Sequence, residues 1–289
     1  MLRIALPNKG RLSDDARDLF NQAGLDVRAT GDRALSASLG GEFEAIFVRA
    51  QDVPEFVADG AADAGITGFD LASEAERDLT SLLDLEFGRC RLILAAREDA
   101  SIETVADMPA DARVATVFPR TTRRFFDESK KSVQIVPISG AAEIAPHLGI
   151  ADFIVDITST GSTLKTNGLR EVCTIAESTA RLFAAPSNGE TWATEKKRAL
   201  DELVGALDSV IRARGKRYLM ANVPRSALGR VKEILPGLNG PTVVDILDGG
   251  LHVAVHAVVP ASSVYRTIAS LKELGAEGIL LTRIERLTP

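Results

Sequence analysis

The chain has 289 residues, which is more than one ordinary domain holds and predicts two or three domains. A hydrophobic content of 45% and a charged content of 26% are typical of a globular protein. The formal net charge of −6 argues against a general nucleic-acid-binding protein, which normally carries a basic excess, although local arginines can still bind a small anionic substrate.

The N-terminal segment contains one short apolar run, residues 2–6, followed by charged residues. It lacks the apolar stretch of a signal peptide, and no run of about 18 apolar residues occurs in the chain. We therefore expect a cytoplasmic location and no membrane partner. The two cysteines, Cys90 and Cys173, lie in apolar runs, which predicts buried free thiols rather than a disulfide.

Short strand-like runs alternate with helical runs through the first two thirds of the chain. Ser13 is the expected N-cap of a first helix that runs to Gly24. The alternation predicts parallel sheets covered on both faces, in two α/β lobes, with the chain crossing between them near Arg91 and returning near Glu171. The predicted strands occupy residues 2–6, 44–50, 63–68, 90–96, 113–118, 133–138, 152–157, 171–176 and 180–186.

A long polar-faced helix is expected at about residues 190–214, and the segment after it follows a different pattern. Strands at 216–223, 242–247, 251–259 and 278–284 and helices at 225–235 and 262–274 give the order β-α-β-β-α-β, with Pro224 opening the first helix. This order is the ferredoxin-like arrangement and predicts a separate regulatory or assembly module.

The chemistry is expected where the strand at 152–157 ends. Asp156 would lie at the carboxyl edge of a parallel sheet, where ligands of α/β folds bind. Gly161 allows a tight turn before a helix, and backbone N–H groups at such a turn can hold a phosphate. A helix N-cap with a polar loop explains the same stretch equally well. The hydroxyls that would add donors belong to Thr158, Ser159, Thr160, Ser162 and Thr163.

A longer pattern around this loop resembles the signature of the ATP phosphoribosyltransferase family. Its residues are Glu143, Gly149, Ala151, Ile154, Asp156, Ile157, Thr160, Gly161, Thr163 and Leu164. Residues 2–15, 63–71, 88–95 and 166–172 also resemble the family, and residues 217–224, 235–243 and 271–280 resemble the C-terminal domain of its long form. The resemblance therefore covers nearly the whole chain.

This resemblance implies a two-lobed catalytic core like the type II periplasmic binding proteins and a C-terminal ferredoxin-like, ACT-like domain. The implied division is lobe I at 1–91 and 175–214, lobe II at 92–174 and the regulatory domain at 215–289. The implied enzyme is a pentosyltransferase that moves phosphoribosyl from 5-phosphoribosyl-1-pyrophosphate to N1 of ATP and releases pyrophosphate, with Mg²⁺, in the first step of histidine biosynthesis.

The resemblance also assigns roles to residues. Asp156 and Glu143 would be the catalytic and metal-binding carboxylates, and the loop at 158–164, including Leu164, would hold phosphoribosyl pyrophosphate. Asn222, Thr242 and Ala276 are implied contacts for histidine as feedback inhibitor, and dimers and hexamers of the chain are expected. The implied ATP-binding residues are Lys9, Gly10, Arg11, Arg49, Asp70 and Leu71.

Some residues and other protein classes leave alternatives open. Glu143 also fits a surface carboxylate, and His252 and His256, four apart on one strand, fit either a half-exposed sheet face or a metal pair. A periplasmic solute-binding protein has two such lobes but needs an export signal. Prephenate dehydratase has a Thr-Arg-Phe motif without a clean match at 121–126. The effector domain of a transcription regulator would follow a helix-turn-helix, which is not found.

Overall fold

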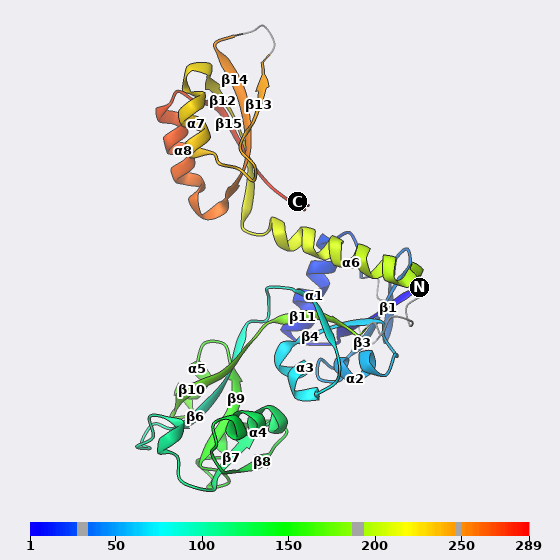
Figure 1. Ribbon diagram of the computed structural model, residues 1–289, viewed down its shortest axis with the longest axis vertical. Helices are drawn as coiled ribbons and strands as arrows, with labels where there is room; N and C mark the ends of the chain where they lie inside the picture. The colour runs from blue at the N-terminus through cyan, green and yellow to red at the C-terminus, as the bar shows by residue number, and fades with distance from the viewer. Residues whose placement is uncertain (28–33, 187–193, 247–249, 289) are drawn as a thin grey trace. The chain divides into compact units, whose positions relative to one another are not determined.

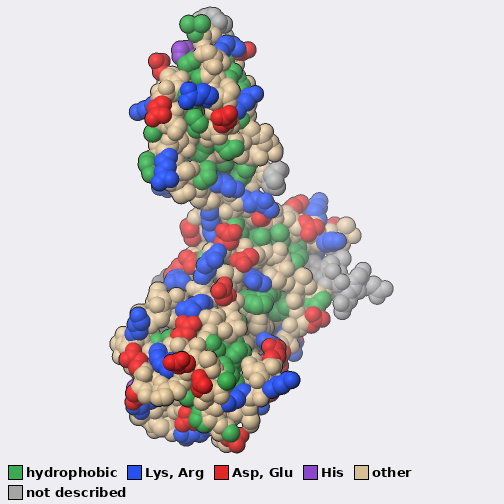
Figure 2. Space-filling model, turned by 60° about the vertical axis from the view of Figure 1, so that its left-hand side comes forward, with side chains coloured by type: hydrophobic (Ala, Val, Ile, Leu, Met, Phe, Trp, Pro, Cys, Tyr) green, Lys and Arg blue, Asp and Glu red, His purple; other side chains and the backbone are tan. Residues whose placement is uncertain are grey.

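The computed structural model describes residues 1–27, 34–186, 194–246 and 250–288. The chain forms two compact units, Met1–Gly205 and Ala206–Pro289, each with its own sheets (Figure 1). Within the described ranges, every helix is too short or too polar to cross a membrane. Acidic and basic side chains are interspersed on the face shown in Figure 2.

The first unit contains two sheets, and we call the layers around them lobe I and lobe II. The sheet of lobe I has the strand order β2-β3-β1-β4-β11-β5, and that of lobe II has the order β10-β6-β9-β7-β8. Lobe I contains β1 (Leu2–Pro7), β2 (Ser36–Gly40), β3 (Phe43–Val48), β4 (Ala64–Gly68), β5 (Thr80–Asp84) and β11 (Ala180–Ala184). Lobe II contains β6 (Cys90–Arg97), β7 (Ala112–Thr116), β8 (Val133–Pro137), β9 (Phe153–Thr158) and β10 (Leu169–Ser178).

Helices connect and cover these strands, so that central strands such as β1 are almost wholly buried. The two sheets confirm the predicted two-lobed α/β core. The helices of the first unit are α1 (Arg11–Gln22), α2 (Val53–Ala58), α3 (Phe69–Ala75), α4 (Pro119–Glu128) and α5 (Ser162–Thr166). Helix α6 (Thr194–Ala213) follows β11, and the predicted start of that helix at 190–193 lies outside the described residues.

The prediction of parallel sheets is wrong in part, because both sheets are mixed. Strand β1 is parallel to β3 and β4, and β7 is parallel to β8 and β9. Strands β6 and β10 are antiparallel to each other, and β11 is antiparallel to β4 and β5. The chain enters lobe II along β6 and leaves it along β10, so these strands must run in opposite directions (Figure 1). The predicted lobe boundaries stay a prediction.

The first helix begins earlier than predicted. Gly10 precedes it with φ 78°, a left-handed conformation that glycine adopts without strain, so the chain turns into α1 directly at Arg11. The backbone N–H groups of Ser13 and Asp14 donate to the carbonyl of Gly10 at 2.9 and 3.3 Å. Ser13 is therefore a buried residue inside the helix rather than its N-cap, and the helix ends at Gln22 rather than Gly24.

Helices α3 of lobe I and α4 of lobe II cap each other. The Glu74 carboxylate accepts the backbone N–H groups of Arg120 and Thr121, at 2.9 and 2.8 Å. Arg120 in turn donates from Nη1 to the carbonyls of Glu74 and Ala75, at 3.3 and 2.8 Å. These are groups that a helix end leaves without partners, and each charge has the sign that the helix dipole favours. The exchange holds the two lobes together on one side.

Removing this carboxylate should weaken the fold. We expect Glu74→Ala to lower the free energy of unfolding by about 1–2 kcal/mol, because two backbone donors of α4 lose their acceptor. Urea denaturation of the purified chain measures the change. Glu128→Ala removes an exposed carboxylate from the other end of α4 and should change stability by less than about 0.5 kcal/mol. Equal effects of the two variants would contradict the capping role.

The second unit confirms the predicted order β-α-β-β-α-β. Its sheet has the order β13-β14-β12-β15, from β12 (Lys216–Pro224), β13 (Thr242–Asp245), β14 (His252–Pro260) and β15 (Glu277–Arg283). Helices α7 (Leu228–Ile234) and α8 (Val264–Glu273) cover one face (Figure 1). The buried side chains Leu219, Val255 and Leu271 belong to its core. Pro224 ends β12 instead of opening α7, because a 3₁₀ turn, Arg225–Ala227, intervenes.

Candidate functional site

The segment after β9 forms the tight turn that its sequence predicts. The first three residues of β9 are buried and Asp156 is half-buried near the end of the strand, beside the parallel strand β7. The turn is closed by the N–H of Gly161, which donates to Thr158 Oγ1 at 2.9 Å. Gly161 has φ 76° and precedes α5, so glycine is required to enter the helix this abruptly.

The residues predicted to hold phosphate differ in their accessibility. Thr158 is nearly buried and its hydroxyl already accepts the bond from Gly161, so it holds the turn in shape. Leu164 is buried in the core of lobe II, so its side chain supports the loop from below. The side chains of Ser159, Thr160, Ser162 and Thr163 are exposed. The loop is therefore open to a ligand rather than sealed inside the core.

Two carboxylates predicted from the sequence meet at one cavity. The cavity measures about 270 Å³ and is lined by Glu143, Asp156 and the loop that follows β9. Glu143 does not lie on a regular helix. It belongs to a single 3₁₀ turn, Ala142–Ile144, which follows the left-handed residue Ala141. The other lining residues are Cys90, Ile157, Thr158, Ser159, Thr160, Thr163 and Leu164.

The charge of Asp156 is poorly compensated by its surroundings. Burial raises the pKa of its carboxyl above the ordinary value of 3.8, and the nearby charge of Glu143 raises it further. The N–H of Ile157, which donates to Asp156 Oδ1 at 2.7 Å, acts in the opposite direction. A cation or a partly positive sugar carbon at this place would stabilise the ionised form.

The same geometry predicts an effect on stability. Because the pKa of Asp156 is higher in the folded chain than in the unfolded chain, its ionisation destabilises the fold as pH rises through that range. We therefore expect Asp156→Asn to unfold at a higher temperature than the wild type at pH 7–8. The difference should close as pH falls below the ordinary value of 3.8, where the wild-type carboxyl is protonated in both the folded and the unfolded state. Thermal unfolding across this pH range measures it, and a lower melting temperature of the variant at pH 7–8 would contradict the prediction.

The residues present fit a magnesium ion only in part. Mg²⁺ prefers oxygen ligands and is commonly held by one or two carboxylates together with substrate phosphates, which matches Glu143 and Asp156. Among the described residues, no group of three or more His, Cys, Asp or Glu side chains is placed to hold a metal. The pair therefore suits an ion that arrives with a phosphorylated substrate. His252 and His256 lie on one face of β14, and His256 Nδ1 is hydrogen-bonded to the Tyr218 hydroxyl.

Basic residues predicted for the nucleotide lie at one edge of the lobe I sheet. Lys9 lies in the exposed turn between β1 and α1, Arg11 is the exposed first residue of α1, and Arg49 directly follows β3. Strands β1 and β3 are parallel neighbours with Pro7 opposite Val48, so their carboxyl ends lie side by side. Lys9, Arg11 and Arg49 therefore lie near one another, and their role in binding a nucleotide stays a prediction.

Asp70 and Leu71 occupy the first turn of α3. The segment before them is the buried strand β4, which confirms the predicted strand at 63–68. Asp70 accepts a hydrogen bond from the Ser178 hydroxyl at 2.6 Å. Leu71 is half-buried against the core of lobe II, so its side chain bridges the lobes.

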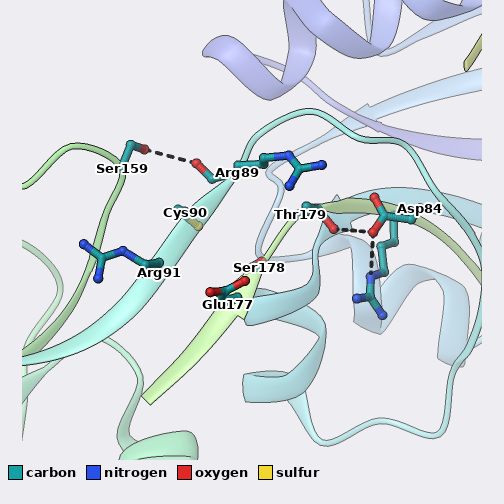
Figure 3. Close-up of a pocket in the computed structure, with 9 residues that line it drawn as sticks. Asp84, Arg89, Cys90, Arg91, Ser159, Glu177, Ser178 and Thr179 are labelled. Carbon is teal, nitrogen blue, oxygen red and sulfur yellow. Dashed lines mark hydrogen bonds and ion pairs between the residues drawn. The ribbon is translucent and has the colours of Figure 1, made fainter. Parts of the chain in front are cut away.

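A second cavity of about 400 Å³ lies where β6 and β10 pass between the lobes (Figure 3). It shares Cys90 and Ser159 with the Asp156 cavity, so the two adjoin. Burial raises the pKa of the Cys90 thiol, and the charge of Asp70 adds to this while Arg11 opposes it. Lobe I residues of the predicted nucleotide site therefore approach the same junction. The remaining lining residues are Asp84, Arg89, Arg91, Glu177, Ser178, Thr179 and Arg181.

Sequence reasoning missed this junction. Cys90 and Ser178 are directly opposite each other in the ladder of β6 and β10, but a pairing between strands so far apart in sequence leaves no local pattern. The sequence indicated this junction only through the predicted crossing of the chain between the lobes near Arg91 and its return near Glu171. Cys90 and Cys173 are free thiols as predicted, although both are half-buried rather than buried.

The predicted histidine contacts are spread across the sheet of the second unit, with Asn222 on the inner strand β12, Ala276 just before the edge strand β15 and Thr242 on the opposite edge strand β13. Asn222 on β12 pairs with Glu277 of β15, which places it near Ala276. Thr242 begins β13, where it pairs with His256 of β14. Since β14 and β12 lie between β13 and β15, these edges are separated by three strand spacings, roughly 14 Å. One copy of the chain therefore brings two of the three residues together.

Comparison with protein families gives two matches that follow one another along the chain. A model described as "ATP phosphoribosyltransferase" matches residues 49–209, and a model described as "HisG, C-terminal domain" matches residues 213–286. The first match alone covers more than half of the chain.

Individual proteins match over their full length. An ATP phosphoribosyltransferase from Gemmatimonas aurantiaca is 66% identical over 295 residues, covering 100% of each chain. One from Haloarcula marismortui is 50% identical over 288 residues, covering 99% of each. Among solved structures, a chain of the ATP phosphoribosyl transferase (HisG:HisZ) complex from Thermotoga maritima superposes with a TM-score of 0.62 and 29% identity, covering 72% of this chain and 99% of that one.

Proposed function

The chain belongs to the ATP phosphoribosyltransferase family, whose members are the pentosyltransferases of the first step of histidine biosynthesis. We therefore propose that the two adjoining cavities of its catalytic lobes hold the two substrates. The substrates are ATP and 5-phosphoribosyl-1-pyrophosphate. The observation that carries this proposal is the convergence of Glu143, Asp156 and an open hydroxyl-rich loop on one cavity.

The loop after β9 holds the 5-phosphate of phosphoribosyl pyrophosphate. Its exposed hydroxyls, at Ser159, Thr160 and Thr163, and its backbone N–H groups supply donors suited to an anion. Gly161 keeps the turn tight, and Thr158 fixes its shape from inside. Asp156, at the edge of this loop, then accepts hydrogen bonds from the ribose hydroxyls.

The reaction needs orientation and charge stabilisation more than proton transfer. Adenine N1 of ATP already carries a lone pair, so it forms the new C–N bond at the anomeric carbon while the C–O bond to pyrophosphate breaks. The ribosyl centre becomes partly positive, and Asp156 with Glu143 stabilises it. Glu143 and Asp156, together with the substrate phosphates, would hold Mg²⁺, which would supply positive charge for the leaving pyrophosphate.

The cations at the edge of the lobe I sheet bind the ATP phosphates. Lys9 and Arg11, at the start of α1, lie near Arg49 at the end of β3, and Gly10 gives the backbone room to approach. At the start of α3, Asp70 binds the ribose of ATP and Leu71 contacts the adenine base. These roles follow the family resemblance and the placement of the residues beside one another.

One assay tests the proposed reaction. The purified chain is mixed with ATP, phosphoribosyl pyrophosphate and Mg²⁺, and formation of N1-(5-phosphoribosyl)-ATP is followed by its ultraviolet absorbance. Omitting either substrate or chelating the metal should abolish the signal. Tight binding of both substrates without turnover would favour a binding protein over an enzyme and would overturn the proposal.

The second unit serves regulation and assembly in this proposal. Histidine binds it as a feedback inhibitor, and copies of the chain form dimers and hexamers. A site that uses Asn222, Thr242 and Ala276 together requires β13 of one copy to lie beside β15 of another, because these strands are opposite edges of the sheet. Inhibition and assembly would then be linked. A cytoplasmic location also stays a prediction.

A further inference from the structure

The start of helix α3 is capped by a residue from another strand. Gly68 stands at the N-cap position and has no side chain with which to cap the helix. Instead, the N–H of Asp70 donates to Ser178 Oγ at 3.0 Å, and the N–H of Phe69 donates to the Thr179 carbonyl at 2.9 Å. Ser178 is the last residue of β10 and is only 5% exposed. The end of β10 therefore supplies the acceptors that this helix end requires.

The same serine hydroxyl also holds the carboxylate of Asp70. Ser178 donates its proton to Asp70 Oδ1 at 2.6 Å while its oxygen accepts the N–H of Asp70. The carboxylate is folded back over its own backbone, and a Cβ at Gly68 would overlap with Oδ1. Glycine at 68 and serine at 178 thus act together to fix one orientation of Asp70.

Ser178 lies where the chain returns from lobe II to lobe I. It stands opposite Cys90 in the ladder of β6 and β10, and both line the cavity between the lobes (Figure 3). The next strand, β11, belongs to the lobe I sheet. The serine therefore connects the strand that joins the lobes to the first turn of α3.

We infer that Ser178 is a positioning residue for the nucleotide site, which holds Asp70 in the orientation that accepts the ribose of ATP. This inference rests on the proposed ATP-binding role of Asp70. Because Ser178 ends the strand from lobe II, the orientation of the Asp70 carboxylate is set by the junction between the lobes and not by lobe I alone. A change in the path of β10 at this point changes the nucleotide site.

The experiment compares Ser178→Ala and Ser178→Thr in the full-length chain. Alanine removes both hydrogen bonds, so the dissociation constant for ATP, from titration calorimetry, should rise about tenfold, while that for phosphoribosyl pyrophosphate changes less than about twofold. Threonine retains the hydroxyl and should restore most of the ATP affinity. Ser209→Ala removes an equally buried serine hydroxyl, which bonds the Ala206 carbonyl, and controls for general loss of packing.

A double-mutant cycle separates this role from an independent one. In the Asp70→Ala background, adding Ser178→Ala should change ATP affinity by less than about twofold, because the serine then has no carboxylate to hold. An equal effect in both backgrounds overturns the inference, and so does wild-type ATP affinity in Ser178→Ala. Gly68→Ala, which displaces the Asp70 carboxylate without touching Ser178, should weaken ATP binding to a similar degree. If Asp70→Ala itself leaves ATP affinity unchanged, the proposed role of Asp70 is wrong, whatever Ser178 does.

Discussion

Asp156→Asn should lower kcat for phosphoribosyl transfer by about 100-fold, because the charge that stabilises a partly positive ribosyl centre is lost while the shape of the side chain is kept. The measurement is the steady-state rate of product absorbance at saturating ATP, phosphoribosyl pyrophosphate and Mg²⁺. Combined with the higher melting temperature expected for the same variant, this result would show that the fold is destabilised by a charge that the reaction requires. Such opposed effects are typical of active-site residues.

A matched control lies four residues earlier on the chain. Asp152 precedes β9, where it is exposed and pairs with Arg113 at 3.3 Å, outside the cavity. Asp152→Asn should therefore retain kcat within about threefold. Wild-type turnover of Asp156→Asn under saturating conditions would remove Asp156 from the catalytic site. The wild-type rate should also decline on acidification at a higher pH than an ordinary aspartate would give, because burial and Glu143 raise the pKa of Asp156.

A chain that ends at residue 214 should lose inhibition by histidine, with the inhibitory concentration raised about 100-fold or more. This truncation keeps α6 complete and removes all four strands of the sheet in the second unit. Among the described residues, the hydrophobic cluster of the second unit lies between Leu219 and Ile279, so the truncation removes this cluster and leaves the clusters of the lobes intact. Initial rates with increasing histidine measure the effect.

A point substitution guards against indirect effects of the truncation. Asn222→Ala in the full-length chain should weaken histidine inhibition about tenfold, because one side-chain amide that could bind histidine is lost. The uninhibited rate should stay unchanged, because Asn222 belongs to the second unit and not to the catalytic lobes. Full inhibition of the truncated chain would place the histidine site in the catalytic core.

Local patterns predicted most of the strands and the main loop. The run before Asp156 is a buried strand, and the hydroxyl-rich segment after it is a turn leading to a helix, because apolar runs and glycines act on their immediate neighbours. The sequence did not predict β2 or β5, which are short edge strands with alternating or weak apolar character. Nor did it reveal that Gly10 rather than Ser13 precedes α1, since both residue types favour helix starts.

Contacts between distant parts of the chain could not be predicted. Asp70 and Ser178 are 108 residues apart, and Glu74 and Arg120 are 46 apart, yet each pair fixes how elements meet. Nothing in the residues around either member specifies its partner, because a hydroxyl or a carboxylate fits many surroundings. The loop and the carboxylate of the candidate site could thus be predicted from the sequence. The junction between the lobes could be recognised only from the strand order of the two sheets.

The strand order of lobe I has a consequence for how the chain is made. Strand β11 lies between β4 and β5, so β5 has no neighbour in its sheet until β11 has been synthesised. All of lobe II comes between these strands in the sequence, and its own sheet is built from one continuous segment. Because the ribosome synthesises the chain from its N-terminus, lobe II can complete its sheet before β11, the neighbour of β5, has been synthesised. The lobe that begins the chain is therefore the later of the two to close.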